Sequence, residues 1–496
     1  MTIQIISSNI NASGPPAIDA GTSDLIIVQA GVVAASDGSF GINVRFADNV
    51  DIEVAGTVVS HGFFGIGGSY TTGESGTRVS VASTGLVAST TNDAMALYGG
   101  GNTIINDGRI IGSDDGIFLA TSSFNYGSGT GIDGAANRVV NNGLILADST
   151  SSGAAAIDLF GSTSGVATIL NSAGGRIVNA AGNDAIYANS ATQLSLTNRG
   201  LIDGDVTIDG ISTFDQTIDT RGGEITGDIA LAGGDDTIDM RNAVIGGEVS
   251  GGGGDDTYLV SSPDIVLSED MGGGTDTVRA LTSYRLADNF ENLTLLGAED
   301  LNGTGNKDAN VIVGNIGDNL LLGGGSGDTL SGNDGDDRLN GGNGADTLNG
   351  GEGDDMLNGA RGDDILRAGA GEDILYGADG RDILTGDFGS AGGDSDMFVY
   401  RSADESTLAN ADRILDFISG EDVLNLVRMD ADTTTAGDQA FDFIGAAGFS
   451  GTAGELRADL AGANGRVEGD IDGDGTADFR IFFNNGAVLV EDDFML

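Results

Sequence analysis

Cysteine and tryptophan are absent from this 496-residue chain, and proline occurs only three times. Without cysteine the protein can form no disulfide, no thiolate zinc site and no cysteine nucleophile. Basic residues are also scarce, because 21 Lys and Arg stand against 75 Asp and Glu, which gives a net charge of −54. A surface this acidic disfavours both phosphate backbones and anionic lipid headgroups, so we expect no nucleic acid among its partners.

Long hydrophobic runs are missing as well. No apolar stretch approaches the roughly 20 residues needed to cross a bilayer, and we expect no membrane insertion. Residues 1–6 show neither a basic region nor an apolar region of the secretory type, so we expect no Sec-type signal peptide. Histidine occurs once, as His61, which excludes metal motifs that need paired histidines.

Glycine is abundant, with 86 residues, and this density disfavours helices. In residues 1–204, short apolar runs follow Gly-containing turns whose glycines lie 23 to 35 residues apart, as from Gly85 to Gly108 and from Gly108 to Gly143. Short strands at such a period are typical of a solenoid with a shared core. We predict an all-β protein that begins with a right-handed parallel β-helix with irregular coils. The rhythm resembles the β-helices of autotransporter passengers and pectate-lyase-like enzymes.

The repeat becomes tighter in residues 205–304. The segment 215–219 returns as 235–239, and its beginning returns again at 255–258, so the period is 20 residues. A regular period predicts coils with fewer excursions, followed by connecting strands, that continue the solenoid.

Residues 305–385 divide into nine consecutive nonapeptides, of which Gly341–Asn349 and Gly350–Asn358 are the most regular. The eighth position is always Leu or Ile, and the first two copies carry Asn310 and Asn319 at the sixth position. The other seven copies carry aspartate there, and a tenth copy after a five-residue interruption adds one more: Asp328, Asp337, Asp346, Asp355, Asp364, Asp373, Asp382 and Asp396.

Each nonapeptide position has a physical role. The glycines permit a tight turn, the carboxylate supplies the hard oxygens that Ca²⁺ prefers, and the eighth residue points inward to build a thin core. The block resembles the RTX repeats, GGxGxDxUx, which form a calcium-binding parallel β-roll. The resemblance implies two nonapeptides in each turn, with calcium between turns on the same side. One row would then hold Asp328, Asp346, Asp364 and Asp382, and the other Asp337, Asp355 and Asp373.

Residues 305–399 are therefore predicted to be a roll that requires calcium to fold, because rows of like charges repel one another without a metal. Asn310 and Asn319 depart from the pattern, and no calcium site is assigned to them.

Residues 400–496 break the repeat, and their apolar pattern predicts a small β-rich cap. Segments 412–417, 420–422 and 473–479 resemble the C-terminal segment of serralysin-type secreted proteins. Within it, carboxylates at alternating positions around Gly473 are typical of a calcium loop, although Ile481 stands where a full EF-hand has glutamate. A metal site and a plain acidic hairpin turn both remain open for Asp470, Asp472, Asp474 and Asp478.

The last residues, 488–496, combine an acidic cluster with terminal apolar side chains. They resemble the uncleaved C-terminal signal of type I secretion, which implies the type I machinery as a partner and an extracellular or cell-surface location. Millimolar extracellular calcium would then fold a chain that stays unfolded in the cytosol.

An RTX block exports many kinds of protein, so it does not identify the function of residues 1–304. No concentrated catalytic set is visible there, and we expect no enzyme. The preferred hypothesis is a structural protein of a surface layer, filament or biofilm matrix, with head-to-tail or lateral self-assembly. An adhesin or binder of cell-surface polysaccharide, and a polysaccharide lyase, hydrolase or epimerase, are the alternatives. Lyase chemistry would need a basic residue, for which the candidates are Arg45, Arg78, Arg109, Arg138 and Arg176.

Overall fold

The computed structural model describes residues 3–12, 17–21, 25–36, 40–44, 49–67, 76–120, 137–149, 153–160, 165–189, 192–210, 212–387, 393–461, 464–484 and 489–496. The elements in these ranges are β-strands apart from two 3-10 helices, η1 (Ala403–Ser406) and η2 (Glu491–Asp493). None of the described segments forms a helix with the length and hydrophobicity of a membrane span. The chain divides into unit 1, Met1–Asp276, and unit 2, Thr277–Leu496. The predicted four-part division of the sequence stays a prediction.

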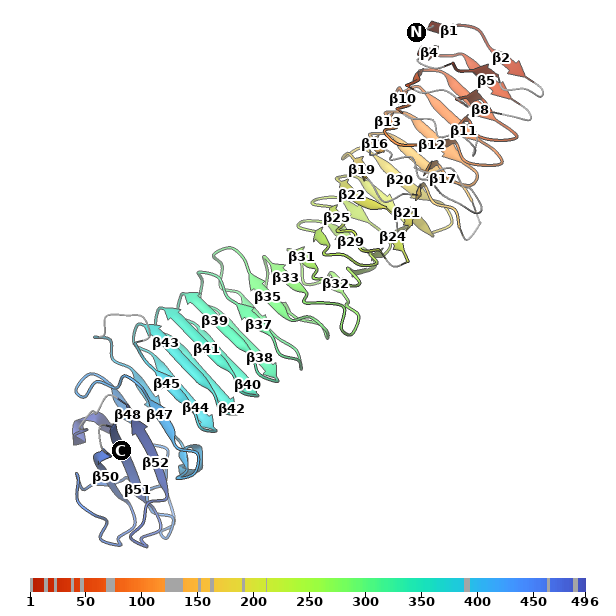
Figure 1. Ribbon diagram of the computed structural model, residues 1–496. Helices are drawn as coiled ribbons and strands as arrows, with labels where there is room; N and C mark the ends of the chain where they lie inside the picture. The colour runs from red at the N-terminus through yellow and green to blue at the C-terminus, as the bar shows by residue number, and fades with distance from the viewer. Residues whose placement is uncertain are drawn as a thin grey trace. The chain divides into compact units, whose positions relative to one another are not determined.

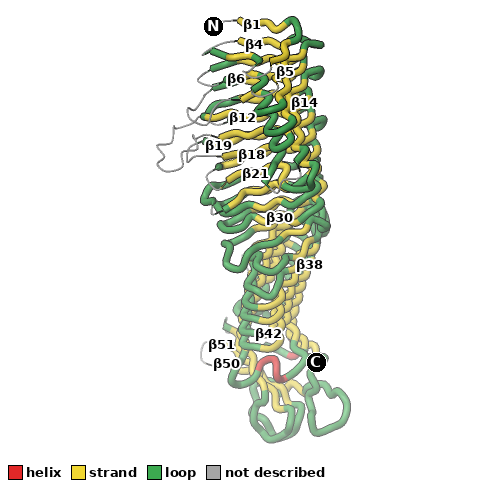
Figure 2. The backbone as a smooth tube through the Cα atoms, turned by 90° about the vertical axis from the view of Figure 1, so that its right-hand side faces the viewer, coloured by secondary structure: helices red, strands yellow, loops and turns green. Residues whose placement is uncertain are grey.

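Unit 1 is a parallel β-helix with three sheets (Figures 1 and 2). A typical coil contributes one strand to each sheet, as with β10 (Arg78–Val81), β11 (Leu86–Ser89) and β12 (Met95–Tyr98). The next coil begins with β13 (Thr103–Asn106), which pairs in parallel with β10. The stacks begin at β1 (Ile3–Ile6), β2 (Ile10–Ala12) and β3 (Ile18–Asp19), and within unit 1 end at β31 (Thr257–Val260), β29 (Val244–Ile245) and β32 (Val266–Leu267). The predicted all-β solenoid is confirmed.

The core of unit 1 runs along the inside of the coils. In β22 (Gln193–Asn198), Leu194, Leu196 and Asn198 are buried and the residues between them are half-buried. This period of two is the ordinary alternation of side chains along a strand. Because parallel strands are stacked in register, equivalent positions of successive coils meet, and their aliphatic side chains form one continuous core.

Buried asparagines line one corner of these coils. The side-chain Nδ2 of Asn106 donates to Oδ1 of Asn141, Asn141 donates likewise to Asn171, and Asn171 to Asn198, each at 2.8 Å. The ladder satisfies amides that are fully buried. Gly143 follows Asn141 by two residues at the same corner, and a Cβ there would collide with the carbonyl oxygen of Gly108 in the preceding coil.

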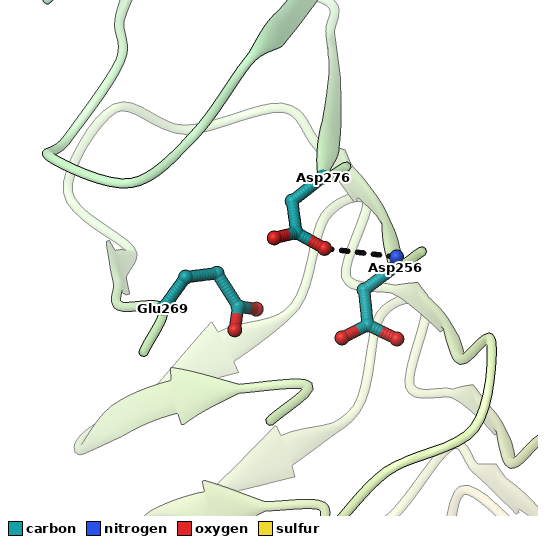
Figure 3. A group of neighbouring side chains, drawn as sticks. All are labelled: Asp256, Glu269 and Asp276. Carbon is teal, nitrogen blue, oxygen red and sulfur yellow. Dashed lines mark hydrogen bonds between the residues drawn. The ribbon is translucent and has the colours of Figure 1, made fainter. Parts of the chain in front are cut away.

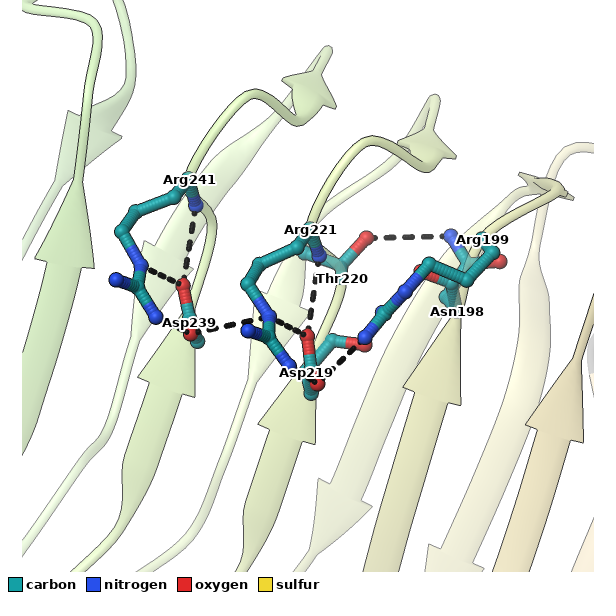
Figure 4. Close-up of polar contacts among 7 residues, drawn as sticks. All are labelled: Asn198, Arg199, Asp219, Thr220, Arg221, Asp239 and Arg241. Atoms are coloured by element: carbon teal, nitrogen blue, oxygen red, sulfur yellow. Dashed lines mark hydrogen bonds and ion pairs between the residues drawn. The ribbon is translucent and has the colours of Figure 1, made fainter. Parts of the chain in front are cut away.

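Ion pairs follow the 20-residue coils on the outside of unit 1 (Figure 4). Asp219, at the end of β25 (Thr217–Asp219), pairs with both Arg199 and Arg221 at 2.7 Å. Arg221 also reaches Asp239 at 3.4 Å, and Asp239 pairs with Arg241 at 2.6 Å. Partial burial acts to raise the pKa of Asp219, but the hydrogen bonds from the two guanidinium groups outweigh it and lower that pKa.

Unit 2 begins as a roll of two parallel sheets, and in the nonapeptide block one turn of the roll takes 18 residues. In one sheet β38 (Leu320–Gly325) pairs with β40 (Arg338–Asn343), so that Leu320 lies opposite Arg338. In the other, β39 (Thr329–Asp334) pairs with β41 (Thr347–Glu352). The inward residues are the eighth positions of the nonapeptides, and all are buried: Ile312, Leu321, Leu330, Leu339, Leu348, Leu357, Leu366, Leu375 and Leu384.

The C-terminal part of unit 2 closes the roll with antiparallel strands. The strands β50 (Glu455–Ala461), β51 (Asn464–Asp470) and β52 (Phe479–Phe483) form two hairpins, and β52 pairs in parallel with β47 (Asp412–Ile414) of the roll sheet. The last strand, β53 (Phe494–Met495), pairs with β48 (Val423–Asn425) in the second sheet. Aromatic side chains fill this end, with the rings of Phe417 and Phe483 5.2 Å apart.

Candidate calcium sites

The sixth-position aspartates of the nonapeptides lie just before the strands of the roll, at the end of each tight turn. Successive turns place them directly above one another, since each strand pairs with the strand 18 residues later. One row therefore contains Asp328, Asp346, Asp364 and Asp382, and the other contains Asp337, Asp355 and Asp373, which is the grouping that the resemblance to RTX repeats implied. All seven are at least 98% buried.

Backbone hydrogen bonds link the members of each row. The N–H of Asp328 donates to Oδ1 of Asp346 at 2.7 Å, and the N–H of Asp346 donates to Oδ1 of Asp364 at 2.7 Å. In the other row the N–H of Asp337 donates to Oδ1 of Asp355 at 2.8 Å. One oxygen of each carboxylate is thereby held in a constant orientation along the row.

The second oxygen, Oδ2, has no hydrogen-bond partner among the described residues in any of the seven aspartates. Each of these oxygens is nevertheless buried, and an unpartnered buried charge is costly unless a counter-charge compensates it. A Cβ at Gly341 or Gly350 would collide with Oδ2 of Asp346 or Asp355. The space beside each carboxylate therefore depends on the glycine at the first position of the repeat.

The comparison with known families agrees with this geometry. The model of the peptidase M10 serralysin C-terminal family matches residues 204–496, which is more than half of the chain. The chain belongs to the peptidase M10 serralysin C-terminal family. No curated protein matches the chain.

Calcium is the ion that a serralysin C-terminal RTX domain binds, and the rows of this chain fit it. Calcium takes six to eight oxygen ligands at about 2.3–2.6 Å, and carboxylates together with turn carbonyls are its usual donors in proteins. The unpartnered Oδ2 atoms are of this type and carry the required charge. The residues that would hold calcium in the roll are the seven row aspartates, and the bound ions would neutralise their charge.

In the absence of metal, burial raises the pKa of aspartates in both rows. It raises the pKa of Asp355 to about 8, with a further contribution from neighbouring Asp373. It also raises the pKa of Asp328 and Asp382 to about 7 and that of Asp364 to about 6. The metal-free roll therefore holds protons that calcium must displace, because a carboxylate binds the ion only after it has lost its proton.

Asp396, from the tenth repeat, continues the second row. Its Oδ1 accepts from the N–H of Asp373 at 3.2 Å, and burial raises its pKa to about 8. The row then reaches a residue that the nonapeptide pattern did not identify, since the N–H of Asp396 donates to Oδ1 of Asp422 at 3.1 Å. In the first row the N–H of Asp382 donates likewise to Asp412 at 2.8 Å.

Asp412 and Asp422 lie 30 and 26 residues beyond their partners rather than 18. No repeat of fixed length could have identified them. The only signal in the sequence was an aspartate placed two residues before a buried apolar residue, Ile414 or Leu424, as in the repeats. At the other end, Asn310 and Asn319 occupy the row positions and use their amides to donate to backbone carbonyls, as Asn310 does to Phe290 at 2.9 Å.

The acidic loop of the cap is the connection between β51 and β52, and it contains the four other predicted ligands. One carboxylate oxygen from each of Asp470, Asp472 and Asp478 lies within 4.8 Å of the others. Asp474 is not part of this group, and its Oδ1 accepts from the N–H of Thr476 at 2.7 Å. The loop is thus a hairpin turn that gathers three carboxylates, and metal binding there stays a prediction.

Proposed function

We propose that this protein is a secreted, non-enzymatic structural protein of a cell surface or extracellular matrix. In this proposal unit 2 is responsible for calcium-dependent folding and type I export. Unit 1 provides the exposed surface that makes contacts within the assembly. The observation that carries the proposal is the repetitive outer face of unit 1. Ser195, Thr217, Thr237 and Thr257 lie opposite one another in successive strands, so that hydroxyl groups form a straight row along the sheet.

A repetitive polar face suits contacts that recur along an assembly better than it suits a single reaction centre. The arginines considered for lyase chemistry also favour a structural role. Arg109 and Arg176 begin strands β14 (Arg109–Gly112) and β20 (Arg176–Asn179) of the second sheet, each as an exposed residue, whereas Arg78 and Arg138 begin strands of the first sheet. They are distributed over two faces rather than gathered at one site. Arg45 lies outside the described residues.

Carbohydrate binding is the second candidate, and one surface feature favours it. A depression on the first sheet is lined by Leu25, Asp51, Ile52, Glu53, Arg78 and Ser80. Arg78 lies opposite Asp51, and Ser80 opposite Glu53, in the pairing of β10 with β7 (Asp51–Val54). Carboxylates, a guanidinium group and a hydroxyl are together suited to hydrogen bonds with sugar hydroxyls.

Electron microscopy and light scattering of the secreted chain, at millimolar calcium and in chelator, test the structural proposal. We expect ordered filaments or sheets with calcium and none in chelator, because the net charge of −54 opposes association until calcium reduces it. A monomer at every concentration, with saturable glycan binding that Arg78→Ala weakens and Arg109→Ala does not, would favour the second candidate. Cleavage of a polysaccharide by the purified chain would overturn the non-enzymatic assignment.

A further inference from the structure

Three buried carboxylates meet in the last coils of unit 1, outside the nonapeptide block. They belong to Asp256, which precedes β31, to Glu269, which follows β32, and to Asp276, the last residue of unit 1. One oxygen of each lies within 4.8 Å of the others, and the three residues are 1%, 8% and 1% exposed. Figure 3 shows the carboxylate of Glu269 facing those of the two aspartates, while Asp276 accepts a hydrogen bond from the N–H of Asp256.

A second observation indicates that this group has a ligand. Oδ1 of Asp256 accepts from the N–H of Asp236 at 2.7 Å, but Oδ2 of Asp256 has no hydrogen-bond partner among the described residues. Since Asp256 is almost completely buried, water does not solvate this oxygen from the surface. Two further carboxylates beside it would make its charge still more unfavourable, unless a cation lies between them.

The turn around Asp256 has the construction of the turns in the roll, although it belongs to the three-sheet unit and not to the roll. The segment Gly251–Leu259 reads GGGGDDTYL, which places glycines at positions one, two and four and aspartate at position six. A Cβ at Gly251 would collide with Oδ2 of Asp256, as a Cβ at Gly341 would with Oδ2 of Asp346. The bond from the N–H of Asp256 to Oδ1 of Asp276, at 2.9 Å, repeats the bond between row aspartates over 20 residues instead of 18.

Two features have no counterpart in the roll. The eighth position holds Tyr258 rather than Leu or Ile, and its hydroxyl donates to Oε1 of Glu269. The N–H of Gly251 also donates to this oxygen at 3.2 Å. These contacts hold Glu269, which the third sheet contributes, against the turn that carries Asp256.

We propose that Asp256, Glu269 and Asp276 bind a calcium ion that joins the last coils of unit 1. Carboxylate oxygens are hard ligands, and two of them up to 4.8 Å apart can both contact an ion whose bonds are about 2.3–2.6 Å long. Magnesium, with bonds of about 2.0–2.1 Å and a strict octahedral shell, suits this spread less well. The ion would connect the first and third sheets where the 20-residue coils end, and its role does not depend on the proposed surface function.

Counting bound calcium in the full chain tests the site. We expect Glu269→Gln to bind one ion fewer than the wild type in equilibrium dialysis, whereas Glu224→Gln, at an exposed position of the same unit, binds the full number. Asp346→Asn provides the comparison for the roll. An unchanged number of bound ions in a folded Glu269→Gln chain would overturn the proposal. If the ion that Glu269→Gln loses is magnesium rather than calcium when both are present, the choice of calcium would be overturned.

Hydrogen exchange of the wild-type chain gives a second measurement that needs no variant. With calcium we expect slower exchange in residues 251–276 than in chelator, by at least about tenfold, while coils far from the site, such as residues 76–120, change little. Equal changes in both segments, or none in residues 251–276, would contradict a local ion.

Discussion

The N–H of Asp346 donates to Oδ1 of Asp364, which lies one turn later in the same row, at 2.7 Å. This bond uses one oxygen of the carboxylate for backbone pairing and leaves the other, Oδ2, buried and without a hydrogen bond among the described residues. The seven aspartates of the two rows, from Asp328 to Asp382, all repeat this division. The roll therefore combines a neutral backbone ladder with a column of oxygens available to calcium, and the predictions below follow from that combination.

Removal of calcium is expected to unfold the roll. The rows hold seven buried carboxylates, and bound calcium would neutralise their charge, so the roll without calcium lacks the free energy of metal binding. Circular dichroism in chelator should show loss of β signal, and proteolysis should cut residues 305–399 first. Added calcium should restore both the signal and the resistance. A spectrum that chelator leaves unchanged would contradict a calcium-driven roll.

Asp346→Asn should weaken calcium binding at the adjoining sites with little damage to the backbone. Asparagine keeps an Oδ1 that can accept from Asp328, and Asn310 and Asn319 occupy the same row positions in the native chain. It lacks the second anionic oxygen, so we expect affinity at the adjoining sites to fall by at least about tenfold, or about 1.4 kcal/mol. Isothermal titration calorimetry with calcium would measure the change in affinity. Glu352→Gln, at an exposed position of the same roll, should bind as the wild type does.

The metal-free roll should become less stable as the pH rises. Burial raises the pKa of Asp328 and Asp382 to about 7 and of Asp355 and Asp396 to about 8, from 3.8 in the unfolded chain. The folded state therefore binds more protons than the unfolded state between about pH 4 and pH 8. The stabilisation is complete below pH 4 and is lost as the pH rises through 7 to 8.

Chelated protein should accordingly show more β signal and a higher urea midpoint at pH 5 than at pH 8. Calcium should reverse the trend, since calcium binding requires the deprotonated carboxylates. A urea midpoint in chelator that rises with pH over this range would show that the row aspartates are ionised in the metal-free roll.

Leu348→Ala should destabilise the calcium-loaded roll by about 2–5 kcal/mol. Leu348 is fully buried in the thin core between the two sheets, and its truncation leaves a cavity that the stacked turns cannot easily close. Urea unfolding at saturating calcium would measure the loss. Leu320→Ala is the matched control, because Leu320 is 38% exposed and its truncation should cost less than about 1 kcal/mol. Equal losses would place the core elsewhere.

Export should depend on the C-terminal part of unit 2. In cells with a type I system, a chain that lacks residues 400–496 should stay inside, and a reporter fused to residues 305–496 should appear in the medium. Immunoblots of cells and medium would compare them. Secretion of the truncated chain at the normal level would remove the type I interpretation.

The sequence by itself determined the features that repeat locally. A period of nine residues places each aspartate and each Leu or Ile at a constant position, so the in-phase aspartates and the buried Leu330, Leu348 and Leu366 could be predicted from spacing alone. The division of the aspartates into two rows came from the resemblance to RTX repeats. The solenoid character of residues 1–204 was also visible, because short strands and Gly turns recur along the chain. In these cases the neighbours in space lie one coil apart along the chain, and the length of a coil follows from the length of the repeat.

Only the tertiary structure decided which residues meet where the coil length changes. Asp412 joins the first row 30 residues after Asp382, and Glu269 reaches Asp256 from a different sheet of the coil. In the acidic loop, Asp470 and Asp478 come together while Asp474 does not. Each outcome depends on the path of an irregular connection. No periodicity encodes that path, which is set by how the connection packs against coils that are already in place.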